Sequence, residues 1–138
     1  MKGGTLSGRG AISDAVTVGT GLSGGILSPG DAKTGTLTIQ SEVTFKTAST
    51  YAYNINTNAA QADELIANGV SIKRGVVFSM VAVGHSQLAV GTVFTVINNT
   101  AATPIIGAFV NLRDGSTFVD AANKFQVSYE AAPATISR

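Results

Sequence analysis

The side chain best suited to acid–base or metal chemistry in this sequence is its single histidine. His85 lies between Gly84 and Ser86, in a predicted turn. An imidazole acts as a general base or a metal ligand only when a partner group orients it, and the sequence places no such partner in view. We therefore interpret His85 as a solvated turn residue, which belongs to neither a catalytic triad nor a histidine metal site.

The carboxylates are few and scattered. Asp63 and Glu64 are the only adjacent pair, but successive side chains of an extended chain point to opposite faces, so a shared acid–base site is not expected. Asp31, Asp114 and Asp120 each lie beside small residues in predicted turns. None of these stretches has the closely alternating carboxylates of a calcium loop. We interpret these three acids as turn residues.

Nucleophile and phosphate motifs are equally weak. Ser28 lacks the context of a hydrolase nucleophile elbow, and the glycine pairs at residues 8–10 and 19–21 are too short to cradle a phosphate. The absence of cysteine excludes thiol catalysis, disulfides and thiolate metal sites. The sequence therefore predicts no catalytic, cofactor-binding or metal-binding residue, no cofactor, and a protein that is not an enzyme.

Tyr51 and Tyr53 are two positions apart in an alternating run, so their side chains face the same way. Exposed aromatic rings on a flat β-surface can stack on sugars, whereas the same pair facing inward would belong to the core. We interpret both as core residues and keep a carbohydrate-binding or polysaccharide-cleaving module as the alternative function. Cleavage would need carboxylates gathered on one face, and the scattered acids give little support for that.

Composition indicates one domain with a neutral surface. The 138 residues suffice to bury a core without disulfides or metals. Charged residues make up only 12% of the chain, about half of the usual share, so hydroxyl and amide side chains cover much of the surface. Nine Lys and Arg against eight Asp and Glu form no evident basic cluster along the sequence. We therefore predict no nucleic-acid partner.

Alternating hydrophobicity predicts an all-β chain of about ten short strands. Residues 36–39, 51–55 and 125–129 alternate with a period of two. Residues 75–83 form the most apolar run and are predicted to be the best-buried strand. Residues 59–67 favour a helix by composition but are too few for a stable one, so a single helical turn and a loop leading into a strand both stay open.

Short motifs recur along the chain. GGTLS at residues 3–7 returns as GGILS at residues 24–28. VTV at residues 16–18 returns as VTF at residues 43–45 and, after an equal step, as VSI at residues 70–72. Such recurrence suits a β-solenoid whose inward strands are alike and whose loops vary in length. Chance recurrence in a Gly- and Thr-rich β protein, and a compact β-sandwich, are the alternatives.

The order of these motifs resembles a known family. The stretches GGTLSG, GGILSPG, GTLTI, STYAYNIN, GVSI, GTVFTVINN, IIGAFVNLRDGSTF and NKFQVSYE resemble the terminal part of bacterial proteins with autotransporter-associated β-strand repeats. The resemblance implies a right-handed parallel β-helix with short irregular coils over residues 1–130. It also implies a stalk, passenger or adhesin role without a defined active site. After SYE this chain has AAPA instead of the family's further Gly- and Asp-rich stretch and apolar strand, so we expect a frayed tail at residues 131–138.

The N-terminal residues lack the apolar core of a signal peptide, so the protein is either cytosolic or a fragment of a longer exported chain. Because repeat-like sequence begins directly at Gly3, we expect the second, an extracellular or cell-surface fragment of a bacterial protein. No window approaches the roughly 18 apolar residues of a membrane span, and we expect no membrane insertion.

The expected function is a non-enzymatic structural or surface module that associates end to end through exposed β edges. Residues 5–7 and 125–130 are the candidate edges, because unpaired backbone groups on an edge strand invite another strand to pair. The expected partners are adjacent β-coils of the same or identical chains, with surface glycans as a further partner.

Overall fold

The structure, a computed structural model, describes residues 3–30, 34–120, 123–129 and 133–137. Within these ranges the chain forms fifteen β-strands and no helix, which confirms the all-β prediction. In chain order the strands are β1 (Thr5–Gly8), β2 (Gly10–Ile12), β3 (Val16–Val18), β4 (Ile26–Pro29), β5 (Thr36–Ile39), β6 (Val43–Phe45), β7 (Thr50–Asn56), β8 (Gln61–Ala62), β9 (Glu64–Ala67), β10 (Val70–Ile72), β11 (Val77–Val83), β12 (Val93–Asn99), β13 (Thr117–Asp120), β14 (Asn123–Ser128) and β15 (Ala134–Ser137).

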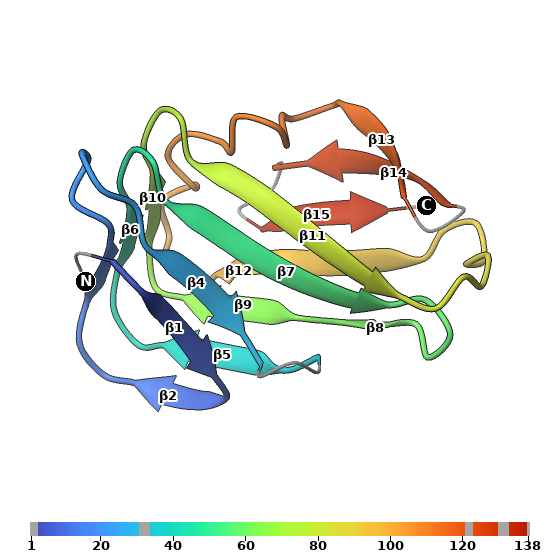
Figure 1. Cartoon of the computed structure of the whole chain (residues 1–138), viewed down its shortest axis with the longest axis horizontal. Coiled ribbons are helices and arrows are strands. Elements are labelled where there is room, and N and C mark those ends of the chain that lie inside the picture. Colours follow the sequence, from blue (N-terminus) through green and yellow to red (C-terminus); the bar gives the residue numbers. More distant parts are fainter. Residues whose placement is uncertain (1–2, 31–33, 121–122, 130–132, 138) are drawn as a thin grey trace.

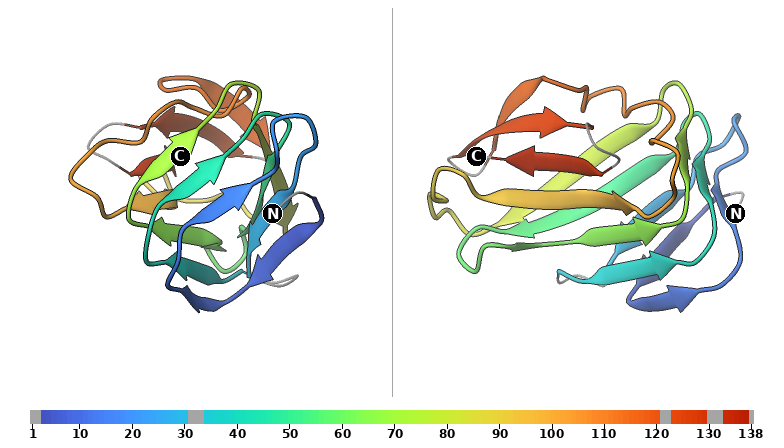
Figure 2. Two further views of the ribbon diagram at one scale, coloured as in Figure 1. Left: turned by 90° about the vertical axis from the view of Figure 1, so that its left-hand side faces the viewer. Right: turned by 180° about the vertical axis from the view of Figure 1, so that it is seen from behind.

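The strands form three sheets. Sheet A contains β1, β4, β7 and β11 in this order, all parallel, with the short β8 antiparallel to β7. Sheet B has the order β13, β14, β15, β12, β9, β5, β2, and sheet C has the order β10, β6, β3. Sheets A and B lie face to face across the core, and sheet C lies across one end of it (Figures 1 and 2).

The recurring motifs of the sequence lie side by side as parallel strands. Thr5 in β1 pairs with Ile26 in β4. Val43 in β6 lies between Val16 in β3 and Val70 in β10. Each recurrence of a motif therefore forms a new strand that pairs in register with the strand of the preceding copy.

The predicted right-handed parallel β-helix over residues 1–130 is nevertheless wrong as a description of the fold, and the layout is sandwich-like. On one side β12 is parallel to β9, but on its other side it is antiparallel to β15. The pairs that continue to β14 and β13 are also antiparallel. Each described sheet ends in edge strands, so none closes on itself. The last recurrence ends at Ile72, and the motifs could predict only the parallel part.

The C-terminal third differs from prediction in its tail and its edges. Where the sequence suggests a frayed tail, Ala134–Ser137 forms β15 between β12 and β14. Ala134 and Ile136 alternate inward and are fully buried, which is enough to hold a short strand on the core. Of the candidate edge at residues 125–130, residues 125–128 lie in β14, which is paired on both sides, and residue 130 lies outside the described residues. Residues 5–7 do lie in β1, an edge strand of sheet A.

Two local predictions have opposite outcomes. Residues 75–83, predicted to be the best-buried strand, contain β11 at the edge of sheet A, where Val81 and Val83 are each 55% exposed. The reason is that this strand packs one face on the core and leaves the other to solvent. Residues 59–67 end a turn and continue into β8 and β9, so of the two alternatives left open the loop leading into a strand is the correct one.

Tyr51 connects all three sheets at the centre of the core. Tyr51 and Tyr53 are fully buried on β7, which confirms that both are core residues. The ring centroid of Tyr51 lies 5.8 Å from that of Phe45 in sheet C and 5.6 Å from that of Phe109. Its hydroxyl donates to the carbonyl of Val96 in sheet B at 2.7 Å. Burial raises the pKa of Tyr51 well above its ordinary value, so the hydroxyl keeps its proton and donates.

The two tyrosines provide a matched test of the core. Tyr51→Phe removes the donor to a buried carbonyl and is expected to lower the free energy of unfolding by about 1–3 kcal/mol. Tyr53→Phe removes a buried hydroxyl that has no partner among the described residues, and it is expected to be neutral or stabilising. Urea unfolding followed by far-UV circular dichroism measures both. Equal losses for the two variants would contradict this account of the core.

Candidate functional site

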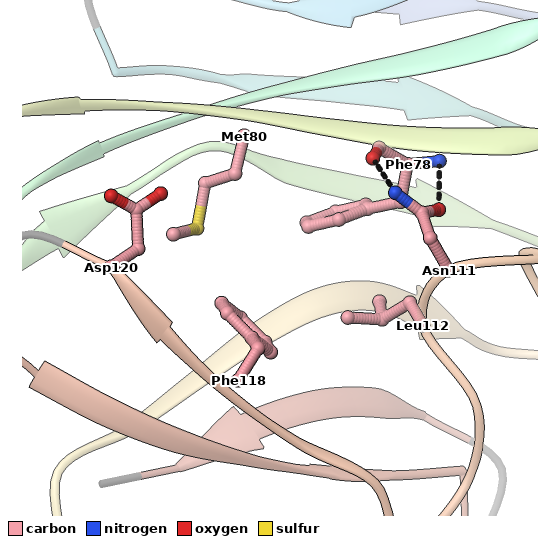
Figure 3. A pocket seen from close by; sticks show the side chains of 6 residues that line it. All are labelled: Phe78, Met80, Asn111, Leu112, Phe118 and Asp120. Carbon is pink, nitrogen blue, oxygen red and sulfur yellow. Dashed lines mark hydrogen bonds between the residues drawn. The ribbon is translucent and has the colours of Figure 1, made fainter.

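Two hollows use the irregular segment 108–113 as part of their walls. The first, which we call the β11–β13 cleft, has a volume of about 220 Å³. Figure 3 shows the side chains that line this cleft, which are Phe78, Met80, Asn111, Leu112, Phe118 and Asp120.

Strand alternation places the cleft residues. Phe78 and Met80 lie two positions apart on β11 and face inward, while Phe118 and Asp120 have the same relation on β13. Both strands are edges, β11 of sheet A and β13 of sheet B. The cleft therefore opens where the two sheets are not joined, and side chains from both sheets reach it.

Two asparagine side chains hydrogen-bond the backbone as a neighbouring strand would. The N–H of Phe78 donates to Oδ1 of Asn111 at 2.8 Å, and Nδ2 of Asn111 donates to the carbonyl of Phe78 at 2.6 Å (Figure 3). Asn123 accepts from the N–H of Leu88 and donates to the carbonyl of Ser86. In Asn111, Nδ2 keeps a second hydrogen and Oδ1 a second lone pair for a ligand.

Asp120 and Phe118 are two cleft residues whose side chains are placed to contact a ligand. The sequence predicts a turn at Asp120, but the structure places it at the end of β13. Its carboxylate forms no hydrogen bond or ion pair within the described part of the chain. The half-buried ring of Phe118 packs on Phe125 with centroids 5.3 Å apart, and it faces the space into which Met80 also points (Figure 3).

The adjacent acids Asp63 and Glu64, which were not expected to share a site, lie in different surroundings. Asp63 is 1% exposed, and its two carboxylate oxygens accept from the N–H of Gly35 and from the N–H and Nδ2 of Asn54, at 2.9 to 3.0 Å. Burial raises the pKa of Asp63, and these hydrogen bonds oppose the rise. Burial also raises the pKa of Glu64, which is half-exposed and hydrogen-bonded to Asn98. Asp63, which lies between β8 and β9, thus connects this part of the chain to Gly35 before β5 and to Asn54 in β7.

The other residues considered from the sequence fall in separate places. His85 is exposed in the loop after β11, as predicted, and Ser28 is half-buried in β4. Asp114 accepts from the backbone N–H of Tyr129 at 3.0 Å. Asp31 lies outside the described residues. Within the described ranges no three His, Cys, Asp or Glu side chains gather into a potential metal site.

The glycine motifs lie in separate surroundings. Gly8 and Gly10 belong to β1 and β2, and Gly19 and Gly21 lie in the loop after β3.

A cluster of basic residues is a candidate binding feature that the sequence did not predict. Phe45 pairs with Ile72, and the N–H of Lys73 donates to the carbonyl of Phe45 at 2.9 Å, so Lys73 lies beside Lys46 on the neighbouring strand. The alignment of VTF with VSI, extended by one position beyond each motif, would have predicted this contact. The second hollow lies close by, has a volume of about 450 Å³ and is lined by Arg74, Gly75, Ala108, Phe109, Val110 and Arg113.

We call Lys46, Lys73, Arg74 and Arg113 the basic corner. None of the four forms an ion pair within the described ranges. Lys46 is half-exposed and the other three are exposed, so the corner can be reached from solvent.

Comparison with protein-family models, with curated proteins and with solved structures gives no match for this chain. The described residues include no helix of the length and apolarity needed to cross a membrane. The resemblance to autotransporter-associated repeat proteins and the expected cell-surface location therefore stay predictions.

The raised pKa of Asp63 predicts how the stability of the fold depends on pH. A carboxyl whose pKa is raised in the fold binds its proton more tightly there than in the unfolded chain, where its ordinary value is 3.8. This contribution to stability is present at low pH and is lost as the pH rises through the raised pKa. Asp63→Asn is expected to remove it and to cost about 1–3 kcal/mol at neutral pH, because its amide would face N–H donors.

The measurement is the free energy of unfolding as a function of pH for the wild type and Asp63→Asn. The control is Asp14→Asn, which removes the same charge from an exposed residue. The difference between the wild type and Asp63→Asn should grow as the pH falls. Parallel curves for all three proteins would contradict the assignment.

Proposed function

We propose that this chain is a non-catalytic carbohydrate-binding module and that the β11–β13 cleft takes one sugar unit. The observation that carries the proposal is that a half-buried aromatic ring, Phe118, and a carboxylate with no partner among the described residues, Asp120, reach one open cleft from the same strand. Pockets that enclose drug-sized ligands have volumes of about 300–1,000 Å³. A cleft of about 220 Å³ suits a single ring.

The lining matches the two kinds of surface that a sugar ring presents. Phe118, Met80 and Leu112 give an apolar wall for the C–H face of the ring. The Asp120 carboxylate can accept hydrogen bonds from hydroxyl groups at the ring edge. The remaining donor and acceptor of Asn111 add a second polar contact, and the bonds of this side chain to Phe78 fix its direction.

Binding fits this cleft better than cleavage. A glycosidase of the common kind uses two carboxyl groups placed about 5 to 10 Å apart across the scissile bond. Asp120 is the only carboxylate among the residues described as lining the cleft. The buried Asp63 is occupied by three N–H donors.

A glycan array followed by isothermal titration calorimetry tests the proposal. Phe118→Leu keeps an apolar side chain but removes the ring, and Asp120→Ala removes the acceptor. Each is expected to weaken binding of the array's best ligand by about tenfold, which equals about 1.4 kcal/mol. Val119→Thr is the matched control, because Val119 lies between them on β13 and is 72% exposed. An array without any bound glycan, or equal affinity for all variants, would contradict the proposal.

Self-association through the edge of β11 is a second candidate function, in keeping with the partner expected from the sequence. The strand has the sequence VFSMVAV, without charge or proline, and all seven residues pair with β7. Because the N–H of Val77 and the carbonyl of Val83 bond on the β7 side, the backbone groups of Met80 and Ala82 face away from β7. Asn111 already occupies the outward groups of Phe78, so the open part of this apolar edge comprises Met80 and Ala82, and an open edge can accept another strand.

A second copy of β11 can satisfy this edge. In an antiparallel pair centred on Val81, Met80 of each copy lies opposite Ala82 of the other, and all outward backbone groups find partners. Sedimentation velocity is expected to show concentration-dependent dimers that Val81→Lys abolishes, because charge on an edge strand opposes pairing. Val90→Lys is the control, since Val90 is 85% exposed in a loop. A monomeric wild type at high concentration would contradict this candidate.

A further inference from the structure

The basic corner places like charges together, and none of its four side chains is in an ion pair with a carboxylate of the described residues. Lys46 and Lys73 occupy neighbouring positions on adjacent strands, which lie about 4.8 Å apart in a sheet. Both side chains follow a buried residue and point outward. Like charges in this relation destabilise a sheet. An anion that binds between or beside the two lysines lowers the repulsion between their charges.

Arg74 and Arg113 extend the corner into a hollow of about 450 Å³. The other residues that line this hollow are Gly75, Ala108, Phe109 and Val110. A guanidinium group binds a carboxylate or a sulfate through two parallel hydrogen bonds, which a lysine ammonium cannot do. The corner therefore combines two point charges with two forked donors, a set suited to several anionic groups in a row.

The hollow and the β11–β13 cleft are neighbours. Ala108, Phe109, Val110 and Arg113 line the hollow, whereas Asn111 and Leu112, within the same short segment, line the cleft. A sugar chain with one unit in the cleft can cross this segment and reach the arginines. We infer that the ligand of this module is an acidic polysaccharide, whose carboxylate or sulfate groups bind at the basic corner.

This inference rests on the proposed carbohydrate-binding function and names its substrate class. A nucleic acid is the less suitable polyanion. Single strands bind through aromatic rings on which bases stack, and Phe109, the aromatic residue of the hollow, is fully buried. Duplex binding relies on a broad excess of positive charge, whereas this chain has a net charge of +1.

Calorimetric titration with four polymers tests the inference: polygalacturonate, dextran sulfate, neutral dextran and single-stranded DNA. The wild type is expected to bind at least one acidic polysaccharide at least tenfold more tightly than dextran and DNA. The double variant Arg74→Gln with Arg113→Gln should lose that advantage. It should also reduce the dependence of log affinity on log salt by about two, one unit for each lost contact.

Lys124→Gln is the charge control, because Lys124 is exposed on β14 and lines neither hollow. It should leave the affinity within twofold of the wild type. Equal affinity for acidic and neutral polymers, an unchanged double variant, or tighter binding of DNA would each overturn the inference. Unchanged binding by Phe118→Leu, together with loss in the arginine variant, would instead refute the sugar site in the cleft and retain the anion site at the corner.

Discussion

The fold depends on one buried ring whose neighbours come from every sheet. Tyr51 packs on Phe45 of sheet C and on Phe78 and Phe109, and its hydroxyl reaches the carbonyl of Val96 in sheet B. Aromatic pairs at these separations add to the free energy gained by burial alone. Because no strand of the described residues belongs to both sheet A and sheet B, contacts through the core such as this one hold the two sheets together. The open cleft exists where that contact ends, at the edges of β11 and β13.

Local patterns could predict the strands and part of their pairing. Alternation in residues 36–39 and 51–55 marks the inward side chains, and the spacing of Val16, Val43 and Val70 marks a column of parallel partners. The antiparallel arrangement of β12, β15, β14 and β13 has no such signal, because no motif recurs there. The predicted fold class is wrong because of this region, where long-range packing decides the direction of each strand.

The candidate site could not be read from the sequence for a related reason. Asp120 lies beside small residues and suggests a turn, yet its proposed role depends on sharing a cleft with Met80, which comes much earlier in the chain and belongs to another sheet. Lys46 and Lys73 are also far apart in sequence, and only the register of β6 and β10 brings them together. By contrast, the burial of Tyr51 and the isolation of His85 follow from local pattern alone.

The side-chain amide of Asn111 satisfies part of the outer edge of sheet A in place of a further strand. By occupying both backbone groups of Phe78, this side chain closes the first part of the β11 edge and leaves only the part beyond it open. A growing fibril adds chains along an uninterrupted edge, and here the interruption is built into the molecule. The same residue that borders the cleft thus limits any assembly at this edge to a short contact and opposes its extension into amyloid.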